Sequence, residues 1–427
     1  MIGVILANTG SPAAPDPDSI EQYLREYLMD ERIRQLPKPM WKYLLHKHIL
    51  PKRKNTSAER YRFIWTEEGS PLVVNAKVLA QKVQRLLDAE ADAGAAGTRL
   101  IAPTIGRDTP GDSLDVGRDA LADSPAIGRD VLPGSPAIEC DASGDFPSVG
   151  HDASGDHQEG EAVASDVQKD AVAGRAVMVL SAMSYGEPSL ADALSQLRNA
   201  GADRVVLLPL YPQSAFSPTM AVVDAFWRAQ DAIGWHPESQ VIDNYHDDAG
   251  YIAAIARSIH DAGFDASSDD RLVLSFHAIP LKDEAAGDTY RTQIAESVRL
   301  IAEQLGVSPE SIVVSFQSVF GHDKSKWTSP LSLDLLESWR DEAFRVVYAC
   351  PGFSIDCLET MYDIPNEMVP ALEGDDAKPV VERVADGDIQ ASCNTNGRFV
   401  WVPTLNTSDE HAELLKSVLD KHIAVAK

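Results

Sequence analysis

Short apolar runs alternate along the chain with longer segments in which apolar residues recur every three or four positions. The runs have the length and composition of buried strands, and they lie at residues 4–7, 177–182, 205–210, 272–276, 312–316 and 345–349. Each run is bounded by Gly, Pro or polar residues, as is typical of strands in an α/β sheet.

Three helices can be placed by their end signals. Ser70 and Pro71 supply a cap and a proline at the first helical position, and an apolar face follows them. A second helix is predicted over residues 288–305, because the next residue is a glycine. Thr407 and Glu410 have the spacing of a capping box, which predicts the start of a C-terminal helix.

Strands that alternate with helices predict parallel sheets with helical crossovers. One such set precedes residue 245 and another follows it, so the predicted fold class is α/β, with two Rossmann-like, doubly wound lobes that face a cleft. At 427 residues the chain also exceeds what one hydrophobic core usually organises. We predict a first lobe over 1–103 and 175–245 and a second over 246–427, whose C-terminal helix can pack back on the first.

Residues 104–174 interrupt this pattern. IGRD at 105–108 recurs as VGRD at 116–119 and as IGRD at 127–130, which gives a period of 11 residues. The segment holds 15 acidic and 4 basic side chains, and its Gly, Pro and Ser content disfavours helix. We expect a disordered acidic insertion in a surface loop, because it cannot bury enough apolar surface to offset its ordering entropy. A repeat that expanded without acquiring a function is favoured over a segment that gathers cations.

The composition is that of an ordinary globular protein, with 44% hydrophobic and 24% charged residues. The net charge of −27 argues against nucleic acid and anionic lipid as general partners, because both attract a surplus of Lys and Arg. The first residues do not form a signal peptide, and nowhere do 18 apolar residues run together. Four cysteines are too few for a disulfide scaffold, so we expect a cytoplasmic protein.

Polar, aromatic and turn-forming residues cluster directly after the predicted strands. The segments read NTGSP at 8–12, AMSYGEP at 182–188, PLYPQS at 209–214, SFHAIP at 275–280, FQSVFG at 316–321 and CPGFS at 350–354. In open α/β sheets ligands bind outside the carboxyl ends of the strands, so six such ends predict a large cleft. None has the form GxGxxG or a phosphate loop, which argues against nucleotide binding.

The candidate chemistry lies after two of these strands. His277 follows a buried strand, where it can cap the sheet edge, take a proton or bind a transition metal. Glu359, Asp363 and Glu367 are spaced to form one stripe on a continuous helix, although Pro365 interrupts it. A stripe of this kind is usually a solvated face, but after the CPGFS loop it should begin inside the cleft. We therefore predict a metal-competent pair, His277 and Glu359.

The motifs, in their order and spacing, resemble the ferrochelatase family, whose members insert ferrous iron into a porphyrin in the last step of haem biosynthesis. The likeness covers nearly the whole chain except the insertion. It is carried by VILANTGSP at 4–12, YLREYLMDERI at 23–33, SAERYRFIWTEEGSPL at 57–72, PLYPQ at 209–213, LSFHAIP at 274–280, FQSVFG at 316–321 with Trp327, CPGFSIDCLETMYDI at 350–364 and VPTLNTSDEH at 402–411. The family fold is two Rossmann-like lobes with the porphyrin in the cleft, and the enzyme class is a lyase forming nitrogen–metal bonds.

The resemblance implies roles for nine residues. His277 and Glu359 match the family's essential histidine and glutamate, which stand on opposite sides of the metal path as catalytic groups and metal ligands. Asp363 and Glu367 match an acidic line along which metal moves inward. The residues that match the porphyrin pocket are Thr9, Ile64, Trp65, Tyr185 and Tyr211. A neutral imidazole can receive a pyrrole proton, and imidazole with carboxylate suits Fe²⁺. Whether His277 acts as base or as ligand stays open.

Porphyrin and ferrous iron are thus the implied substrates, with no tightly bound cofactor. Some family members carry an iron–sulfur cluster, but this chain lacks their clustered C-terminal cysteines, so no [2Fe-2S] cluster is expected. Cys350 and Cys357 have neither zinc-ribbon nor ferredoxin spacing and are interpreted as structural or incidental thiols. Transient contact with a membrane or with the preceding haem-pathway enzyme stays open, as does the oligomeric state.

The sequence departs from the family pattern at three places. Ser184 and Val319 stand where many relatives have Arg, and the segment 214–224 departs from the usual Ser/Thr/Gly-rich loop. These differences concern substrate detail. The alternatives are a coproporphyrin III ferrochelatase, a chelatase for cobalt or nickel, and a non-catalytic porphyrin or haem carrier. Cobalt and nickel chelatases tend to have a histidine where this chain has Glu359, which disfavours that alternative.

Overall fold

The computed structural model describes residues 1–34, 36–99, 176–321, 323–374, 377 and 397–423. The insertion predicted over 104–174 lies outside these residues. The described parts of 1–98 and 169–427 belong to one compact unit, which contains every element named below except Arg99, the last residue of α4.

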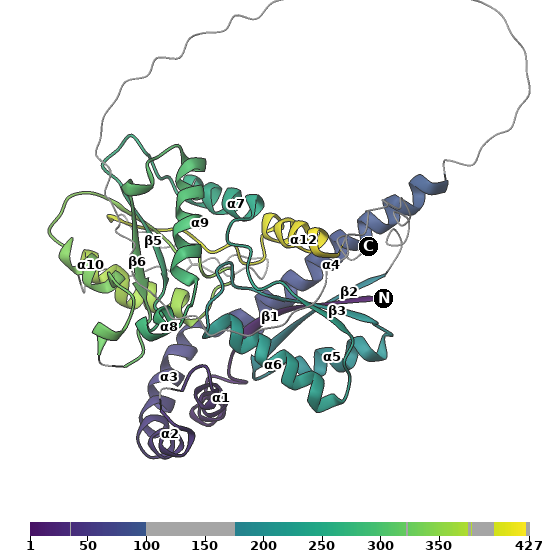
Figure 1. The fold of residues 1–427 in the computed structure, drawn as a ribbon. Coiled ribbons are helices and arrows are strands. Elements are labelled where there is room, and N and C mark those ends of the chain that lie inside the picture. Colours follow the sequence, from purple (N-terminus) through teal and green to yellow (C-terminus); the bar gives the residue numbers. More distant parts are fainter. Residues whose placement is uncertain (35, 100–175, 322, 375–376, 378–396, 424–427) are drawn as a thin grey trace, which may run out of the picture. The chain divides into compact units, whose positions relative to one another are not determined.

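Two four-stranded parallel sheets organise this unit (Figure 1). The first has the order β2–β1–β3–β4 and consists of β1 (Ile2–Gly10), β2 (Val177–Tyr185), β3 (Arg204–Pro209) and β4 (Glu238–Val241). The second repeats this order as β6–β5–β7–β8, with β5 (Arg271–His277), β6 (Ile312–Gln317), β7 (Val346–Ala349) and β8 (Phe399–Trp401). The predicted α/β class with two doubly wound parallel sheets is confirmed.

The helices that cross between strands are numerous and mostly short. Between β1 and β4 they are α1 (Pro17–Met29), α2 (Lys38–Leu44), the π-helix η1 (Leu45–Ile49), α3 (Leu50–Ile64), α4 (Pro71–Arg99), α5 (Leu190–Asn199) and α6 (Pro218–Ile233). From β4 to the last described residue they are α7 (Ala249–Asp261), α8 (Leu281–Ala285), α9 (Tyr290–Leu305), η2 (Pro309–Ser311), η3 (Lys324–Lys326), α10 (Ser332–Ser338), the π-helix η4 (Glu359–Met368), α11 (Val369–Glu373) and α12 (Asp409–Ile423). Within the described residues, no helix is long and apolar enough to cross a membrane.

Both faces of the first sheet are covered, because side chains alternate between them along β1. Val4 and Leu6 pack with Leu79 of α4. Ile5 and Ala7 belong instead to the cluster that includes α5 and α6. A strand buried on both faces reads as a continuous apolar run, which is why the sequence pattern revealed it.

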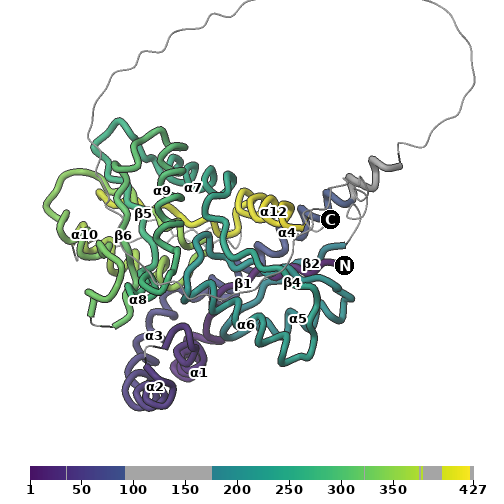
Figure 2. The backbone as a smooth tube through the Cα atoms, in the orientation of Figure 1, coloured from purple at the N-terminus to yellow at the C-terminus, as the bar shows by residue number. Residues whose placement is uncertain are grey.

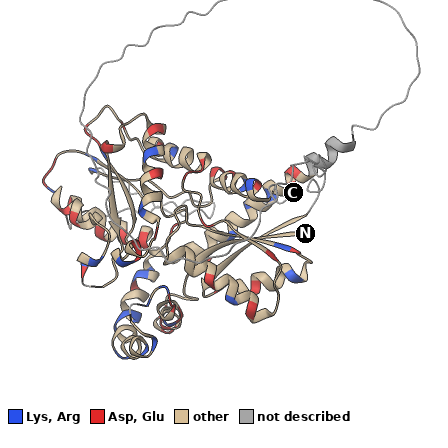
Figure 3. Cartoon of the chain, in the orientation of Figure 1, with Lys and Arg blue, Asp and Glu red and all other residues tan. Residues whose placement is uncertain are grey.

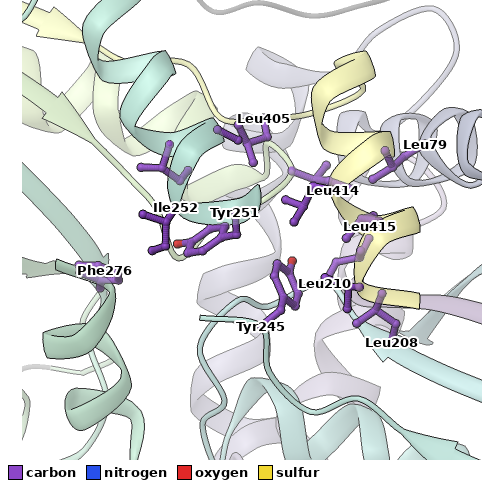
Figure 4. Close-up of a cluster of buried hydrophobic side chains, with 14 of the residues drawn as sticks. Leu79, Leu208, Leu210, Tyr245, Tyr251, Ile252, Phe276, Leu405, Leu414 and Leu415 are labelled. Carbon is purple, nitrogen blue, oxygen red and sulfur yellow. The ribbon is translucent and has the colours of Figure 1, made fainter. Parts of the chain in front are cut away.

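The second sheet is covered in the same way. Leu274 packs in the cluster with α7 and α9, whereas Val273 belongs to a separate cluster with α10, α11 and β8. Helix α12 adds Leu414 and Leu415 to the first of these clusters, which also contains residues of α4 and β3. Figure 4 shows Leu414 and Leu415 beside Leu79 and Leu208, in the cluster that also contains Phe276 of β5, so a continuous core connects the two sheets.

The predicted ends of two helices agree with the structure. Helix α4 begins at Pro71. Helix α9 begins at Tyr290, whose backbone N–H donates to Asp288 Oδ1 over 2.8 Å. It ends at Gly306, which has a left-handed φ of 69°. A glycine adopts this conformation without the steric cost that other residues incur.

The capping box predicted for α12 is wrong by one residue. The hydroxyl of Ser408 accepts the backbone N–H of His411 over 3.1 Å, so Ser408 is the capping side chain. Thr407 Oγ1 is buried and has no hydrogen-bond partner among the described residues. The preceding Asn406 has a φ of 43°, and this left-handed residue sets which hydroxyl faces the first turn.

Helices α1, α2 and α3 stand together beside the sheets, at the purple end of the chain in Figure 2. They have a core of their own, which includes Leu24 and Tyr61. Tyr185 of β2 and Met361 of η4 belong to the same cluster. The three helices are therefore anchored to β2 of the first sheet and to η4, which follows β7 of the second.

Candidate active site

A cavity of about 910 Å³ lies where the carboxyl ends of β1, β3 and β5 meet α1, α3 and η4. In each sheet the first strand lies between the second and the third, which places a topological switch point at its carboxyl end. Thr9 and Tyr211 line the cavity from the first switch point, and His277 lines it from the second. Glu359 and Asp363 of η4 also line it. The predicted strand-end residues are thus brought to a single cavity.

The end of β1 requires a glycine. Gly10 has a φ of 112°, and a Cβ placed there would lie 1.9 Å from the backbone oxygen of Tyr185. The close approach of β1 and β2 therefore holds the preceding Thr9 at the cavity wall. The Tyr211 hydroxyl donates to Asn8 Oδ1 over 2.8 Å and also bonds the Thr9 hydroxyl. Burial raises the pKa of Tyr211, so its phenol stays neutral near physiological pH.

His277 is the last residue of β5, and its ring is oriented by the neighbouring peptide. Its Nδ1 lies 2.7 Å from the carbonyl oxygen of Ala278. A carbonyl only accepts, so Nδ1 carries the hydrogen and, in the neutral ring, Nε2 keeps its lone pair. The ring lies against Phe353, with 6.4 Å between centroids. The histidine therefore presents one basic nitrogen.

Glu359 is the first residue of η4. Gln317 at the end of β6 donates from Nε2 to the Glu359 carbonyl oxygen over 3.1 Å, so the neighbouring strand fixes the start of this helix. Four residues later Asp363 is 7% exposed, and its carboxylate accepts from Ser318 Oγ over 3.3 Å. Burial chiefly, and then the charges of Glu359 and Glu367, raise the pKa of Asp363 to about 8.

A buried polar network lies beneath Glu359. Asp356 is 1% exposed and accepts from Thr360 Oγ1 at 2.8 Å, Thr404 Oγ1 at 2.9 Å and Asn406 Nδ2 at 2.8 Å. Burial raises the pKa of Asp356, and these three hydrogen bonds oppose that effect. The network ties the first turn of η4 to the loop before α12, which holds Glu359 in place.

The acidic stripe survives Pro365, contrary to the expected interruption. Residues 359–368 form a π-helix in which Pro365 is an internal residue, and α11 continues from it. A π-helix accommodates an extra residue in the turn, and such turns are frequent at functional sites. Asp363 and Glu367 both reach the guanidinium of Arg60 on α3, at 3.1 and 3.0 Å. Glu367 itself does not line the cavity.

Arg60 was not recognised from the sequence as a site residue. It lies in the family string at 57–72, but nothing in its local pattern indicates a partner about 300 positions away. Only the packing of α3 against η4 brings the arginine to the acidic stripe.

Aromatic and aliphatic side chains form much of the remaining cavity wall. Tyr27 of α1 meets Tyr185 edge-on, with ring centroids 5.3 Å apart. Further lining residues from these helices are Tyr23, Leu24, Tyr61 and Ile64. Trp65, which was expected in the pocket, lies outside the lining and meets Tyr61 edge-on at 6.3 Å. A wall of this kind suits a flat, largely apolar ligand.

The described cysteines are free thiols. Cys350 is buried, and Cys357 lines the cavity beside Glu359. Burial raises the pKa of both thiols, so both stay protonated near neutral pH. Among the residues that the structure describes, no three His, Cys, Asp or Glu side chains are grouped closely enough to hold a metal ion.

Comparison with known proteins gives the family. A model of the ferrochelatase family matches residues 1–107 and 156–423. A ferrochelatase of Nitrosococcus oceani is 28% identical over 424 residues, which cover 99% of this chain and 87% of the relative. A ferrochelatase of Azoarcus sp. is 32% identical over 373 residues, which cover 87% of this chain and 79% of the relative.

Among solved structures, SirB from Bacillus subtilis with Fe³⁺ matches at 12% identity and a TM-score of 0.40, covering 58% of this chain and 82% of SirB. A score this low carries no argument about function. The family match over both sheets and all the elements around the cavity is sufficient by itself, and the chain belongs to the ferrochelatase family.

Proposed function

We propose that this enzyme inserts Fe²⁺ into protoporphyrin IX, with His277 and Glu359 as its catalytic and metal-binding pair. The observation that carries the proposal is that both side chains line one cavity of about 910 Å³. This volume lies at the upper end of the roughly 300–1,000 Å³ that is typical of small-molecule sites. A porphyrin is a large, flat ligand, and the aromatic wall from α1 and α3 supports its stacking.

The reaction exchanges two pyrrole protons for one metal ion. His277 is suited to receive a proton at Nε2, because its Nδ1–H is already held by the Ala278 carbonyl. Glu359 supplies a hard oxygen ligand, and a mixed imidazole–carboxylate pair binds Fe²⁺ without the tight grip of thiolates. The Asp356 network keeps Glu359 in position while the metal passes.

We assign the cavity wall to the porphyrin. In this proposal Thr9 and Tyr211 lie near the face at which metal enters, and Tyr185 and Ile64 contact the macrocycle. Trp65 supports Tyr61 from behind, since it meets that ring edge-on. Asp363 and Glu367 form the route by which metal arrives, and the exposure of Glu367 supports this direction.

The proposed enzyme is cytoplasmic and needs no resident cofactor or [2Fe-2S] cluster. Burial raises the pKa of Cys350 and of Cys357, which supports the proposal that these two thiols do not hold a metal cluster, because a protonated thiol is a poor metal ligand. An assay that contains only protein, porphyrin and ferrous iron tests the requirement directly.

The test is anaerobic Fe²⁺ insertion, followed by porphyrin absorbance, with protoporphyrin IX and coproporphyrin III in parallel. We expect His277→Ala and Glu359→Gln each to lower kcat by at least about 100-fold. Porphyrin binding, measured by fluorescence quenching, should persist in both variants. His260→Ala, at an exposed histidine on α7, is the matched control and should retain full activity.

Absence of insertion by the wild-type protein would contradict the proposal. A carrier would bind porphyrin without turnover in every variant. Faster insertion into coproporphyrin III would replace the proposed substrate while leaving the reaction intact.

A further inference from the structure

The acidic stripe of η4 already has a cation. Arg60 Nη1 donates to Asp363 Oδ1 at 3.1 Å, and Arg60 Nη2 donates to Glu367 Oε1 at 3.0 Å. One guanidinium therefore spans both carboxylates. Its charge is permanent, because an arginine does not lose its proton in a protein.

The arginine is held in this position by its neighbours. Its guanidinium carbon lies 4.9 Å from the centroid of the Tyr362 ring, and Phe63, one turn further along α3, meets the same ring edge-on at 5.5 Å. Near the start of α3, Arg53 stacks over Phe320 at 4.6 Å. Helix α3 is thus docked on the elements that follow β6 and β7, and Arg60 is fixed over the stripe.

The charges of the two helices are complementary. Helix α3 is basic and contains one acid, Glu59, against Lys52, Arg53, Lys54, Arg60 and Arg62 (Figure 3). The stripe on η4 contains three carboxylates, and the helix has no Lys or Arg. An arriving divalent cation and Arg60 therefore compete for the same oxygens.

The exposed fractions of the three side chains place this competition where the acidic stripe meets solvent. The side chain of Glu367 is 36% exposed and that of Asp363 is 10% exposed, while Arg60 is 40% exposed. A cation from solvent meets Glu367 first and Asp363 afterwards, and Arg60 and Asp363 both line the cavity. The guanidinium of Arg60 contacts both carboxylates, so a cation that moves from Glu367 to Asp363 meets it.

We propose that Arg60 is a built-in counter-cation that a divalent metal must displace from Asp363 and Glu367, so that Arg60 sets the affinity of the entry route for metal. In this role it is a positioning and specificity residue rather than a catalytic one. Arg60 prevents the two carboxylates from holding metal tightly, and it reduces the fraction of time for which other cations occupy them. The inference rests on the proposed function, because it assumes that metal travels along this stripe.

The experiment is a Mn²⁺ titration of the metal-free full chain without porphyrin, at a pH above the pKa of Asp363, with free Mn²⁺ measured by electron paramagnetic resonance. Removing a permanent charge next to the carboxylates should tighten Mn²⁺ binding by on the order of tenfold in Arg60→Gln. Arg60→Met keeps a long side chain next to Tyr362 without the charge, and it should show the same gain. Arg60→Lys retains the charge and should stay near wild type.

Two further variants locate the effect. Adding Asp363→Asn to Arg60→Gln should abolish the gain. Arg299→Gln is the matched control, because Arg299 bridges Glu296 and Glu303 on the surface of α9. That variant also frees two carboxylates, and it should leave Mn²⁺ affinity unchanged.

Kinetics provide the second readout. In Arg60→Gln the apparent KM for Fe²⁺ should fall several-fold and inhibition by Zn²⁺ should strengthen, which a merely structural defect would not produce. Equal Mn²⁺ affinity in wild type and in both neutral variants would overturn the inference, even if iron insertion proceeds. Absence of iron insertion by the wild-type protein would instead contradict the proposed function. The Mn²⁺ titration would still decide whether Arg60 competes with metal for Asp363 and Glu367.

Discussion

At the scale of single residues, the chemistry of the site depends on which polar atoms already have a hydrogen-bond or ion-pair partner. His277 uses Nδ1 on a neighbouring carbonyl, which leaves Nε2 for chemistry. Position after a buried strand predicts that this histidine and Glu359 lie in the cleft, and both line the cavity. Their catalytic and metal-binding roles come from the family resemblance and not from position. Arg60 escaped detection because its partners are on a distant helix. Local patterns reveal residues at strand ends, whereas a pairing between remote elements depends on the final packing.

His411, which lies outside the cavity lining, makes the free energy of unfolding depend on pH. His411 is fully buried, donates from Nδ1 to the Asn406 carbonyl, and its Nε2 has no hydrogen-bond partner among the described residues. Burial lowers the pKa of His411 to about 4. The unfolded chain binds this proton below about pH 6.5 while the folded chain does not, so the stabilisation is complete above that pH and is lost as the pH falls toward 4.

We expect this histidine to account for about 3 kcal/mol of lost unfolding free energy between pH 7 and pH 4. His411→Phe fills the same space without a titrating group and should lack this component, although it also loses one hydrogen bond at every pH. Denaturant unfolding of both proteins across the range gives the comparison. Parallel pH profiles for the two proteins would show that His411 does not titrate as described.

At the scale of elements, strand ends and helix turns place the functional groups. The six predicted strands all form, because each is a continuous apolar run. Strands β4 and β8 were missed: β4 reads ESQV and is only partly buried, and β8 has three residues. The π-helical form of η4 was also not foreseen, since Pro365 predicts an interruption in an α-helix and the extra residue in a π-turn has no simple sequence signal.

Among the glycines that the structure describes, Gly10 at the end of β1 leaves the least room for a methyl group. In Gly10→Ala the new Cβ would meet the Tyr185 backbone oxygen at 1.9 Å, and an alanine also resists a φ of 112°. Neither backbone can move without disturbing the pairing of β1 with β2. We expect a loss of about 3 kcal/mol or more in unfolding free energy, together with weaker porphyrin binding.

Chemical denaturation and porphyrin titration measure the two effects. Gly234→Ala is a suitable comparison, because its φ is also positive but nothing lies within 4 Å of the added Cβ. It should cost clearly less stability and leave porphyrin binding unchanged. Equal losses in the two variants would show that the close approach to Tyr185 has no special weight.

At the scale of the whole molecule, the same four-stranded order occurs twice, and each copy places a switch point at the cavity. The alternation of strands and helices predicts both sheets, and the C-terminal helix is the element predicted to pack back on the first lobe. Helix α12 supplies much of the connection. It bonds α4 through Lys82 and Asp409 at 2.8 Å, and its His422 bonds Arg204 of β3 and Gln240 of β4 at 3.4 and 3.1 Å.

This connection makes the stability of the two sheets interdependent. Leu415 of α12 is fully buried in the cluster that contains both Leu208 of β3 and Leu274 of β5. Leu415→Ala should lower the unfolding free energy by about 2–5 kcal/mol, through lost transfer free energy and the cavity that remains. Because the cluster is continuous, amides of β1 and β5 should lose hydrogen-exchange protection to the same extent.

Hydrogen exchange followed by mass spectrometry separates the peptides of the two sheets. Leu281→Ala, at a leucine that is 40% exposed, should leave protection in both sheets nearly unchanged. If Leu415→Ala weakened only β1 to β4, the sheets would be separate cooperative units and the cavity would open by local unfolding of one of them. Equal loss in both means that the histidine of one sheet and the threonine of the other are held together by one core, so the geometry of the site is as stable as the whole unit.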